Sequence, residues 1–421
     1  MEFFNYKDGV LHCEDVSLSE IANEVGTPFY CYSLSHIEKR FNEYKNGFSQ
    51  KKHVICYAIK ANSNLSVLHF LAGLGSGADI VSGGELFRAL KAGINPKKIV
   101  YSGVGKKEEE IRYALNQNIL MINVESLEEL DLISKISASM KKKAPIAFRV
   151  NPDVDPKTHP YISTGLKKNK FGLSIEQALY AYKKAINLDW IEIKGIDCHI
   201  GSQILETTPF IDAFRRIKAL IKEIEQLGIN ISYIDIGGGL GISYKDSEMP
   251  PDPESYIKKI LKEAEHIDKT IIVEPGRSIV GNAGALITKI LYFKDNSYKS
   301  FYIVDAAMND LGRPSLYDAY HKILPVAEPD TSDEIEVDIV GPICETGDFF
   351  ARDRKIAKLD SGALLAIMNS GAYGFTMSSN YNSRPRVPEI VVKDNKFFVA
   401  RQRETYDDLV AHEKIFDILG G

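Results

Sequence analysis

Between residues 53 and 274 the sequence repeats one unit, a short apolar segment followed by an amphipathic segment. The apolar segments are rich in Val and Ile without polar alternation, which is typical of parallel strands buried on both faces. They lie at 53–59, 77–82, 98–103, 119–124, 145–150, 193–200, 233–237 and 270–274. Segments such as 84–92, 126–139 and 210–227 have one apolar face, as helices packed on a sheet do. Eight such units over about 220 residues predict an α/β fold, a (β/α)8 TIM barrel, rather than an open doubly wound sheet.

After about residue 280 the pattern changes to closely spaced apolar segments with turn signals and few helical stretches. These segments lie at 285–293, 299–305, 335–340 and 388–399, and the polar run inside the last one predicts a hairpin over 392–397. We therefore expect a β-rich domain, sandwich-like or barrel-like, formed by residues 280–421 together with residues 1–26. The barrel domain is expected over residues 27–279.

Composition argues against several kinds of partner and site. The 421 residues are 44% hydrophobic and 26% charged, and the net charge of −5 gives no reason to expect nucleic acid or a membrane as partner. No apolar stretch approaches the ~20 residues that span a bilayer, and the N-terminal segment lacks the pattern of a secretory signal. The five cysteines are scattered without a C-x-x-C pair, which argues against a disulfide framework or a structural zinc site. A cytoplasmic protein is expected.

The most unusual strand end is 57–62 (YAIKAN), where an apolar strand delivers Lys60 to the expected mouth of the barrel. Active sites of TIM barrels lie at the C-terminal ends of the strands. A desolvated lysine has a lowered pKa and a nucleophilic amine, which suits attack on an aldehyde. Taken alone, a lysine at the end of a strand is more often a surface residue whose stem is buried and whose amine reaches solvent, but the neighbouring motifs favour the nucleophile.

Glycines follow the seventh predicted strand in 235–241 (DIGGGLG), and a second Gly-Arg loop, 275–277, follows the eighth. A glycine run lets the backbone approach an anion and point N–H groups at it. TIM barrels often bind phosphate in the loops after strands seven and eight. The two loops together favour phosphate binding over a simple tight turn.

Two further strand ends carry ionisable side chains. Glu274 ends an apolar strand, and a fixed carboxylate there could keep the ring nitrogen of a pyridine cofactor protonated, or form a salt bridge with Arg277. His199 could be a core histidine, a metal ligand or a ring stacked on a flat cofactor. No further metal ligands are patterned around it, so we expect no metal ion.

Cys344 lies in 341–348 (GPICETGD), a loop flanked by Gly and Pro in the β-rich half. A lone cysteine is usually a small buried hydrophobic residue. In a loop and beside Glu345, its protonated thiol could instead act as a general acid.

In combination these motifs resemble the fold-type III pyridoxal phosphate enzymes, and most closely the diaminopimelate decarboxylase family. The matching segments, in the order of that family, are 57–62, 199–203, 235–241, 274–277, 312–320, 341–348 and 371–373. The resemblance therefore runs from about residue 25 to about residue 410. One departure is visible, because Asp197 stands where many relatives have a histidine.

The resemblance implies pyridoxal 5'-phosphate as cofactor and a homodimer whose β-rich domains contribute to shared active sites. Lys60 would hold the cofactor as a Schiff base, and Cys344 would protonate the α-carbon from across the subunit interface. The residues implied to bind the cofactor are Lys60, His199, Ser202, Gly237, Gly238, Gly239, Glu274, Pro275, Gly276, Arg277 and Tyr373. Those implied to bind substrate are Arg277, Arg313, Tyr317, Glu345 and Tyr373.

The implied reaction is decarboxylation of meso-2,6-diaminopimelate to L-lysine and carbon dioxide, the last step of lysine biosynthesis. The far end of that substrate carries a carboxylate and an ammonium, which suits Arg277, Arg313 and Glu345 together. Ornithine carries only an ammonium there, so two arginines would be left beside a like charge. The alternatives are decarboxylation of carboxynorspermidine, ornithine or arginine, and a non-catalytic homologue that binds a partner.

Overall fold

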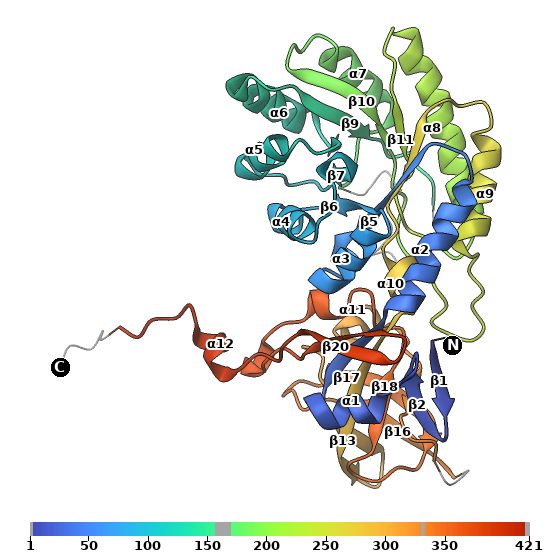
Figure 1. Cartoon of the computed structure of the whole chain (residues 1–421), viewed down its shortest axis with the longest axis vertical. Coiled ribbons are helices and arrows are strands. Elements are labelled where there is room, and N and C mark those ends of the chain that lie inside the picture. Colours follow the sequence, from blue (N-terminus) through green and yellow to red (C-terminus); the bar gives the residue numbers. More distant parts are fainter. Residues whose placement is uncertain (1–2, 156–169, 330–332, 417–421) are drawn as a thin grey trace. The chain divides into compact units, whose positions relative to one another are not determined.

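The computed structural model describes residues 3–155, 170–329 and 333–416. The chain divides into two compact units, one of residues 36–281 and one of residues 1–35 with 282–421 (Figure 1). The sequence predicts these boundaries at 27 and 279. They differ because β4 (Phe29–Ser33) pairs with β13 (Gly284–Asp295) and β19 (Glu389–Lys393), which ties residues 29–33 to the second unit.

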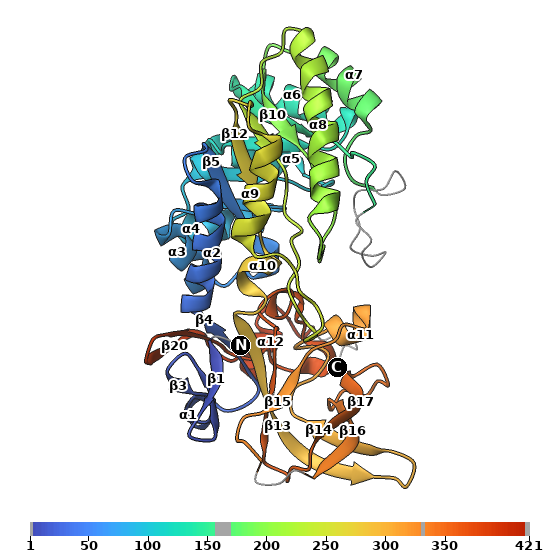
Figure 2. The ribbon, with the colours of Figure 1, turned by 90° about the vertical axis from the view of Figure 1, so that its right-hand side faces the viewer.

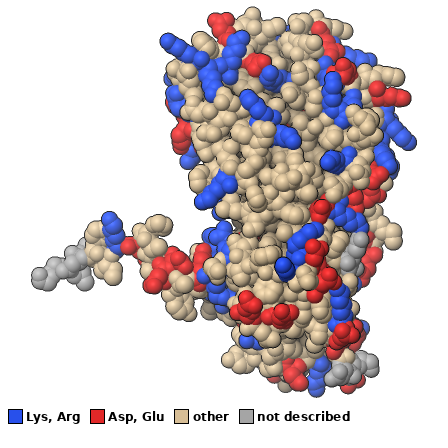
Figure 3. Space-filling view, in the orientation of Figure 1, with Lys and Arg blue, Asp and Glu red and all other residues tan. Residues whose placement is uncertain are grey.

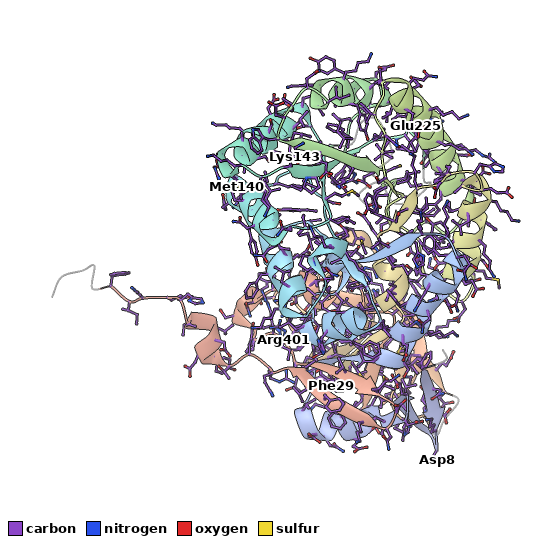
Figure 4. All side chains as sticks on the ribbon, turned by 45° about the horizontal axis from the view of Figure 1, so that its top comes forward. Asp8, Phe29, Met140, Lys143, Glu225 and Arg401 are labelled. Carbon is purple, nitrogen blue, oxygen red and sulfur yellow. The ribbon has the colours of Figure 1, made fainter. Side chains whose placement is uncertain are left out.

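The first unit is a closed barrel of eight parallel strands, which confirms the predicted fold. Each predicted apolar segment overlaps one strand, and the circle closes where β12 pairs with β5. The strands are β5 (His53–Ala58), β6 (Gly77–Ile80), β7 (Ile99–Tyr101), β8 (Met121–Val124), β9 (Ala144–Arg149), β10 (Ile191–Asp197), β11 (Tyr233–Asp235) and β12 (Thr270–Val273). Figure 4 views this unit obliquely, with Lys143 marking the chain just before β9.

Helices alternate with these strands along the chain. They are α2 (Leu34–Phe48), α3 (Leu65–Gly73), α4 (Gly83–Lys91), α5 (Glu108–Gln117), α6 (Leu127–Met140), α7 (Ile175–Ala185), α8 (Thr208–Gln226), α9 (Pro253–Glu263) and α10 (Arg277–Val280). Their starts are encoded locally, since Ser82, Ser126 and Asp252 each accept a hydrogen bond from a backbone N–H of the first turn. The apolar face of α8 is buried along its length, as the period of 210–227 predicted.

The barrel interior changes in chemistry from the middle of the strands to their C-terminal ends. Midway along the strands the interior is apolar, with Cys56, Val100, Met121, Ala147 and Ile272 packed together. Buried polar and charged side chains lie at or just after the C-terminal ends of the strands. These are Asp79, Ser102, Asn123, Arg149, Asp197, Asp235 and Glu274. The barrel thus has a polar rim where the sequence predicted the functional residues.

The second unit is built on a nine-stranded mixed sheet (Figure 2). Its main path runs β17 (Phe349–Ala357), β16 (Glu334–Val340), β14 (Ser300–Val304), β13, β4, β19 and β20 (Lys396–Arg401). β18 (Leu364–Ile367) pairs with β13, and β15 (Ile323–Pro325) pairs with β18. The predicted β-rich domain is confirmed as a mixed sheet, in which the 12-residue strand β13 takes part in both branches.

Shorter elements complete the second unit. β1 (Phe4–Lys7), β2 (Val10–Cys13) and β3 (Val16–Ser17) form their own three-stranded sheet, and a turn at Asp8 and Gly9 joins the first two strands. The helices are α1 (Leu18–Val25), α11 (Arg313–Tyr317) and α12 (Tyr406–Val410). The predicted hairpin is formed by β19 and β20, in register Val392 to Phe397.

Lys and Arg side chains alternate with Asp and Glu side chains over the face of the molecule seen in Figure 3. This mixture agrees with the small net charge of −5. Within the described ranges, none of the helices combines the length and the apolar character needed to cross a membrane.

Candidate active site

Lys60 lies on the short helix Ile59–Ala61 that directly follows β5, on the polar rim of the barrel. Its amine forms an ion pair with Asp79 at the end of β6. The Asp79 side chain is fully buried, whereas that of Lys60 is 34% exposed. A lysine held against a buried carboxylate is not a surface lysine extended into water. Asp79 was missed in the sequence, although a charged residue in the apolar segment 77–82 was a usable signal.

Glu274 follows β12 on the same rim and is buried. Its Oε1 accepts a hydrogen bond of 3.3 Å from Ser102, and Ser102 in turn accepts one of 3.1 Å from Asn123. Burial, and next the charge of Asp235, raise the pKa of Glu274 well above its ordinary value. The residue therefore favours a proton or a cationic partner.

His199 contacts the glycine loop, because its Nδ1 accepts a hydrogen bond of 3.1 Å from the N–H of Gly238. Burial, followed by the positive charges of Arg149 and Lys60, lowers the pKa of His199 well below its usual value. The imidazole is therefore neutral, with its proton on Nε2. A neutral ring suits packing against a flat aromatic ligand.

The glycine loop 237–239 packs too tightly for any side chain. Gly237 and Gly239 have φ angles of +68° and +107°, which favour glycine. A Cβ on Gly238 would lie 2.1 Å from the carbonyl oxygen of Glu274, and Asp235 holds the loop by accepting a bond of 2.9 Å from the Gly237 N–H. The loops after β11 and β12 thus touch, at the place where the sequence predicted phosphate binding.

Arg277 begins α10, in the second of these loops, and is buried. Its guanidinium donates to the Tyr244 hydroxyl at 2.7 Å and to the Ser202 hydroxyl at 3.2 Å. Pro275 is fixed by its carbonyl, which accepts from Ala58 N–H at 3.0 Å. Two residues predicted from the sequence, Ser202 and Arg277, are therefore in direct contact. Arg277 also contacts Tyr244, which the sequence did not predict.

A buried cation, Arg149, lies at the end of β9 and was also not identified from the sequence. Its Nη1 donates to Glu125 at 2.8 Å, and its Nε lies 3.9 Å from a carboxylate oxygen of Asp197. Asp197 is the residue at which the sequence departs from the pattern that the resemblance implies. Its carboxylate belongs to a group of three with Asp235 and Glu274.

The second unit holds the other predicted residues. Arg313, the first residue of α11, is buried with its Nη1 2.9 Å from Nε2 of His321. Tyr317 ends the same helix and is partly exposed. Tyr373 is partly exposed and has a φ of +55°, a conformation that is uncommon for a tyrosine. His321 had no signal in the sequence beyond its closeness to Arg313.

The loop 341–348 is held at its base by Asp348, whose carboxylate accepts hydrogen bonds of 2.7 Å from the backbone N–H groups of Ile343 and Met308. This leaves Cys344 and Glu345 exposed at the tip. The Cys344 N–H donates to Asn382 at 3.2 Å, and Glu345 accepts from Tyr381 at 2.8 Å. The exposed Cys344 is therefore not a small buried core residue.

Comparison with known proteins places this geometry in context. Residues 34–281 match the family model of the pyridoxal-dependent decarboxylase, pyridoxal binding domain. The chain is 51% identical over 408 residues to a diaminopimelate decarboxylase of Aquifex aeolicus, covering 97% of this chain and 96% of the relative. It is 51% identical over 417 residues to one of Vibrio cholerae, covering 99% of each.

Solved structures give the same result. The crystal structure of diaminopimelate decarboxylase from Helicobacter pylori complexed with L-lysine has a TM-score of 0.90 at 47% identity, covering 94% of this chain and 98% of that chain. The enzyme from M. jannaschii in co-complex with L-lysine has a TM-score of 0.93 at 39% identity, covering 98% of each.

Proposed function

This chain belongs to the pyridoxal-dependent decarboxylases, and within them to the diaminopimelate decarboxylase family, and from this we propose that it converts meso-2,6-diaminopimelate to L-lysine and carbon dioxide. That reaction is the last step of lysine biosynthesis. The observation that carries the proposal is the amine of Lys60, held against Asp79 on the rim that also bears Glu274 and the glycine loop.

The residues of the rim fit pyridoxal phosphate. Lys60 offers an amine for a Schiff base, and Glu274 offers a buried carboxylate for a cationic ring nitrogen. No Cβ has room in the loop 237–239, which allows a close approach of the backbone. The N–H groups of Gly237 and Gly238 already donate to Asp235 and His199, so we assign the phosphate to the N–H of Gly239, beside Ser202 and Arg277. When bound, the cofactor supplies an electron sink for the negative charge left as carbon dioxide departs. We assign His199 to the ring face, and Pro275, Gly276 and Tyr373 to the phosphate side.

We assign the proton transfers and substrate contacts to the second unit. Cys344 would hold its thiol proton for delivery to the α-carbon, and its exposure on a loop fixed by Asp348 supports that role. Arg313 would bind the distal carboxylate, since its contact with His321 leaves a fixed, planar guanidinium. Tyr317, Glu345 and Tyr373 would complete the substrate site, with Glu345 as partner of the distal ammonium.

We further propose a homodimer in which one subunit supplies Lys60 and the other supplies Cys344 to each site. The exposed tip of the loop 341–348 supports this arrangement, because a catalytic thiol needs a site that excludes water. Mixing inactive Lys60→Ala and Cys344→Ala chains tests it. Random exchange should restore about a quarter of the activity, since half of the dimers then hold one intact site. Activity that stays at zero after exchange would contradict shared sites.

The substrate is tested by measuring carbon dioxide release from meso-diaminopimelate, ornithine, arginine and carboxynorspermidine. We expect release from meso-diaminopimelate at least ~100-fold above the others, because the arginines would be unpaired beside a distal ammonium. Release from ornithine or arginine alone would reassign the substrate. No release from any of them, with no yellow colour from the cofactor, would favour a non-catalytic homologue.

We further propose that the protein works in the cytoplasm. Its five cysteines are all unpaired, which suits a reducing compartment.

A further inference from the structure

Three carboxylates lie together at the ends of neighbouring barrel strands. Asp197 ends β10, Asp235 ends β11, and Glu274 follows β12. Asp197 and Asp235 are direct partners in the strand register. One carboxylate oxygen of each residue lies within 4.8 Å of those of the other two, and the residues are 1%, 0% and 5% exposed. We call these three residues the carboxylate triad.

Each nearby cation has a closer carboxylate outside the triad. Arg149 donates to Glu125 at 2.8 Å but lies 3.9 Å from Asp197, and Lys60 is paired with Asp79. Three carboxylates this close, away from water, cannot all be ionised, because their mutual repulsion adds to the loss of hydration. The triad must therefore hold at least one proton.

The hydrogen bonds of the triad have room for such a proton. Asp235 accepts from Gly237 through Oδ1, and Glu274 accepts from Ser102 through Oε1. Among the described residues, no donor reaches Asp197 Oδ1 or Asp235 Oδ2. Buried polar atoms without partners are rare, and a carboxyl O–H between neighbouring members would provide the donor that they lack.

The direction of the pKa shifts agrees with this geometry. Burial, and next the charge of Asp235, raise the pKa of Asp197 well above its ordinary value. Burial also raises the pKa of Asp235 to about 7, although the Gly237 N–H opposes the shift. The other titratable groups that interact with the triad are Cys56 on β5, Lys60 after β5, Asp79 on β6, Glu125 after β8, Arg149 on β9, Tyr182 on α7, Cys198 after β10 and Tyr256 on α9.

We propose that the triad shares a proton as one unit, and that Asp197 is a positioning residue which acts through Asp235 on Glu274. Its negative charge strengthens the hold of Glu274 on a proton. With the cofactor bound, one triad proton would pass to the ring nitrogen: a carboxyl O–H bond breaks, an N–H bond forms, the triad becomes more negative by one charge and the ring more positive by one. This last step rests on the proposed function, whereas the shared proton does not.

The shared proton is tested without cofactor, by thermal unfolding of the apoprotein between about pH 5 and about pH 9. A folded state with raised carboxyl pKa values binds more protons than the unfolded chain, so stability falls as pH rises from about 4 through about 7. Asp197→Asn removes one of these groups, so the midpoint temperature of its unfolding should fall less steeply as pH rises. The difference in midpoint between the variant and the parent should therefore shift in favour of the variant with increasing pH. Asp235→Asn should behave alike, and serves if Asp197→Asn does not fold.

Tyr182→Phe is the matched control. The Tyr182 hydroxyl donates to Gly195 on β10 at 2.8 Å, two residues from Asp197, and is buried. Its loss should lower the midpoint by the same amount at every pH in this range. If Asp197→Asn and Asp235→Asn also give curves parallel to the parent, the triad proposal is wrong.

The role toward the cofactor is tested by the visible spectrum of the holoenzyme against pH. With one negative charge fewer, Asp197→Asn should lose the yellow band at a pH about one unit lower than the parent, and Tyr182→Phe at the same pH as the parent. An unshifted Asp197→Asn band would overturn the positioning role, even with carbon dioxide release intact. A parent that never turns yellow would instead refute the proposed function and leave the apoprotein result standing.

Discussion

Nε2 of His321 lies 2.9 Å from Nη1 of Arg313, while Nδ1 of the same ring lies 2.8 Å from the carbonyl oxygen of Met368. A carbonyl only accepts, so Nδ1 carries the ring proton and Nε2 accepts from the guanidinium. His321 is thus a neutral, fully buried support that orients Arg313. The orientation is set by a contact that neither residue's neighbours in the sequence predict.

His321→Ala should therefore weaken substrate binding more than the chemical step. We expect KM for meso-diaminopimelate to rise about tenfold, the value of one hydrogen bond to a charged group, with a smaller change in kcat. Steady-state kinetics measure both. His69→Ala is the control, because the His69 ring also forms a hydrogen bond to a backbone carbonyl, that of Ala92, but belongs to the barrel unit, whereas Arg313 belongs to the second unit. It should leave KM unchanged. An equal fall in kcat and kcat/KM for His321→Ala would assign Arg313 to the transition state instead.

Lys60→Arg should abolish both the yellow colour and turnover. The guanidinium keeps the charge beside Asp79 but cannot form a Schiff base, so the ion pair survives while the covalent attachment is lost. We expect carbon dioxide release to fall by at least ~1000-fold. Absorption spectra and carbon dioxide assays check this, and a yellow variant that turns over would remove Lys60 from the mechanism.

Cys344→Ala should lower kcat at least ~100-fold and leave the yellow colour, because it removes a proton donor and not a cofactor contact. The side chain is exposed, so the free energy of unfolding should change by less than about 0.5 kcal/mol. Of the five cysteines, all within the described ranges, Cys344 is the one exposed in the single chain, so a thiol reagent should label one group rapidly in the dissociated parent subunit and none in the variant. Assembly of the proposed dimer should slow that labelling. Full turnover by Cys344→Ala would exclude the general acid.

Gly238→Ala should weaken cofactor binding. The new Cβ would lie 2.1 Å from the Glu274 carbonyl oxygen, so the loops after β11 and β12 must move apart. We expect the dissociation constant for pyridoxal phosphate to rise at least about tenfold, measured by titration of the apoprotein. Gly73→Ala, at the end of α3 with open space around its Cβ, is the control. Equal affinities of both variants for pyridoxal phosphate would show that the loop 237–239 does not bind the phosphate.

The sequence by itself determined the architecture. Runs of Val and Ile at a spacing of one strand and one helix are a local signal, and all eight predicted strands lie in the barrel. The same logic found Lys60 and Glu274, because a charge at the end of an apolar strand stands out in the sequence. The hairpin at 392–397 was equally local, since its two strands are neighbours in the chain.

Only the tertiary structure decided which of these groups meet. Asp79 joins Lys60 because β5 and β6 are adjacent, and Asp197, Asp235 and Glu274 converge because the neighbouring parallel strands β10, β11 and β12 end on one rim. The boundary near residue 35 has the same origin, since β4 pairs with strands some 250 and 360 residues away in the chain. Periodicity can be read from neighbouring residues. Charge pairing and strand order depend on how distant strands pair as the barrel closes, and no local segment of the sequence carries that information.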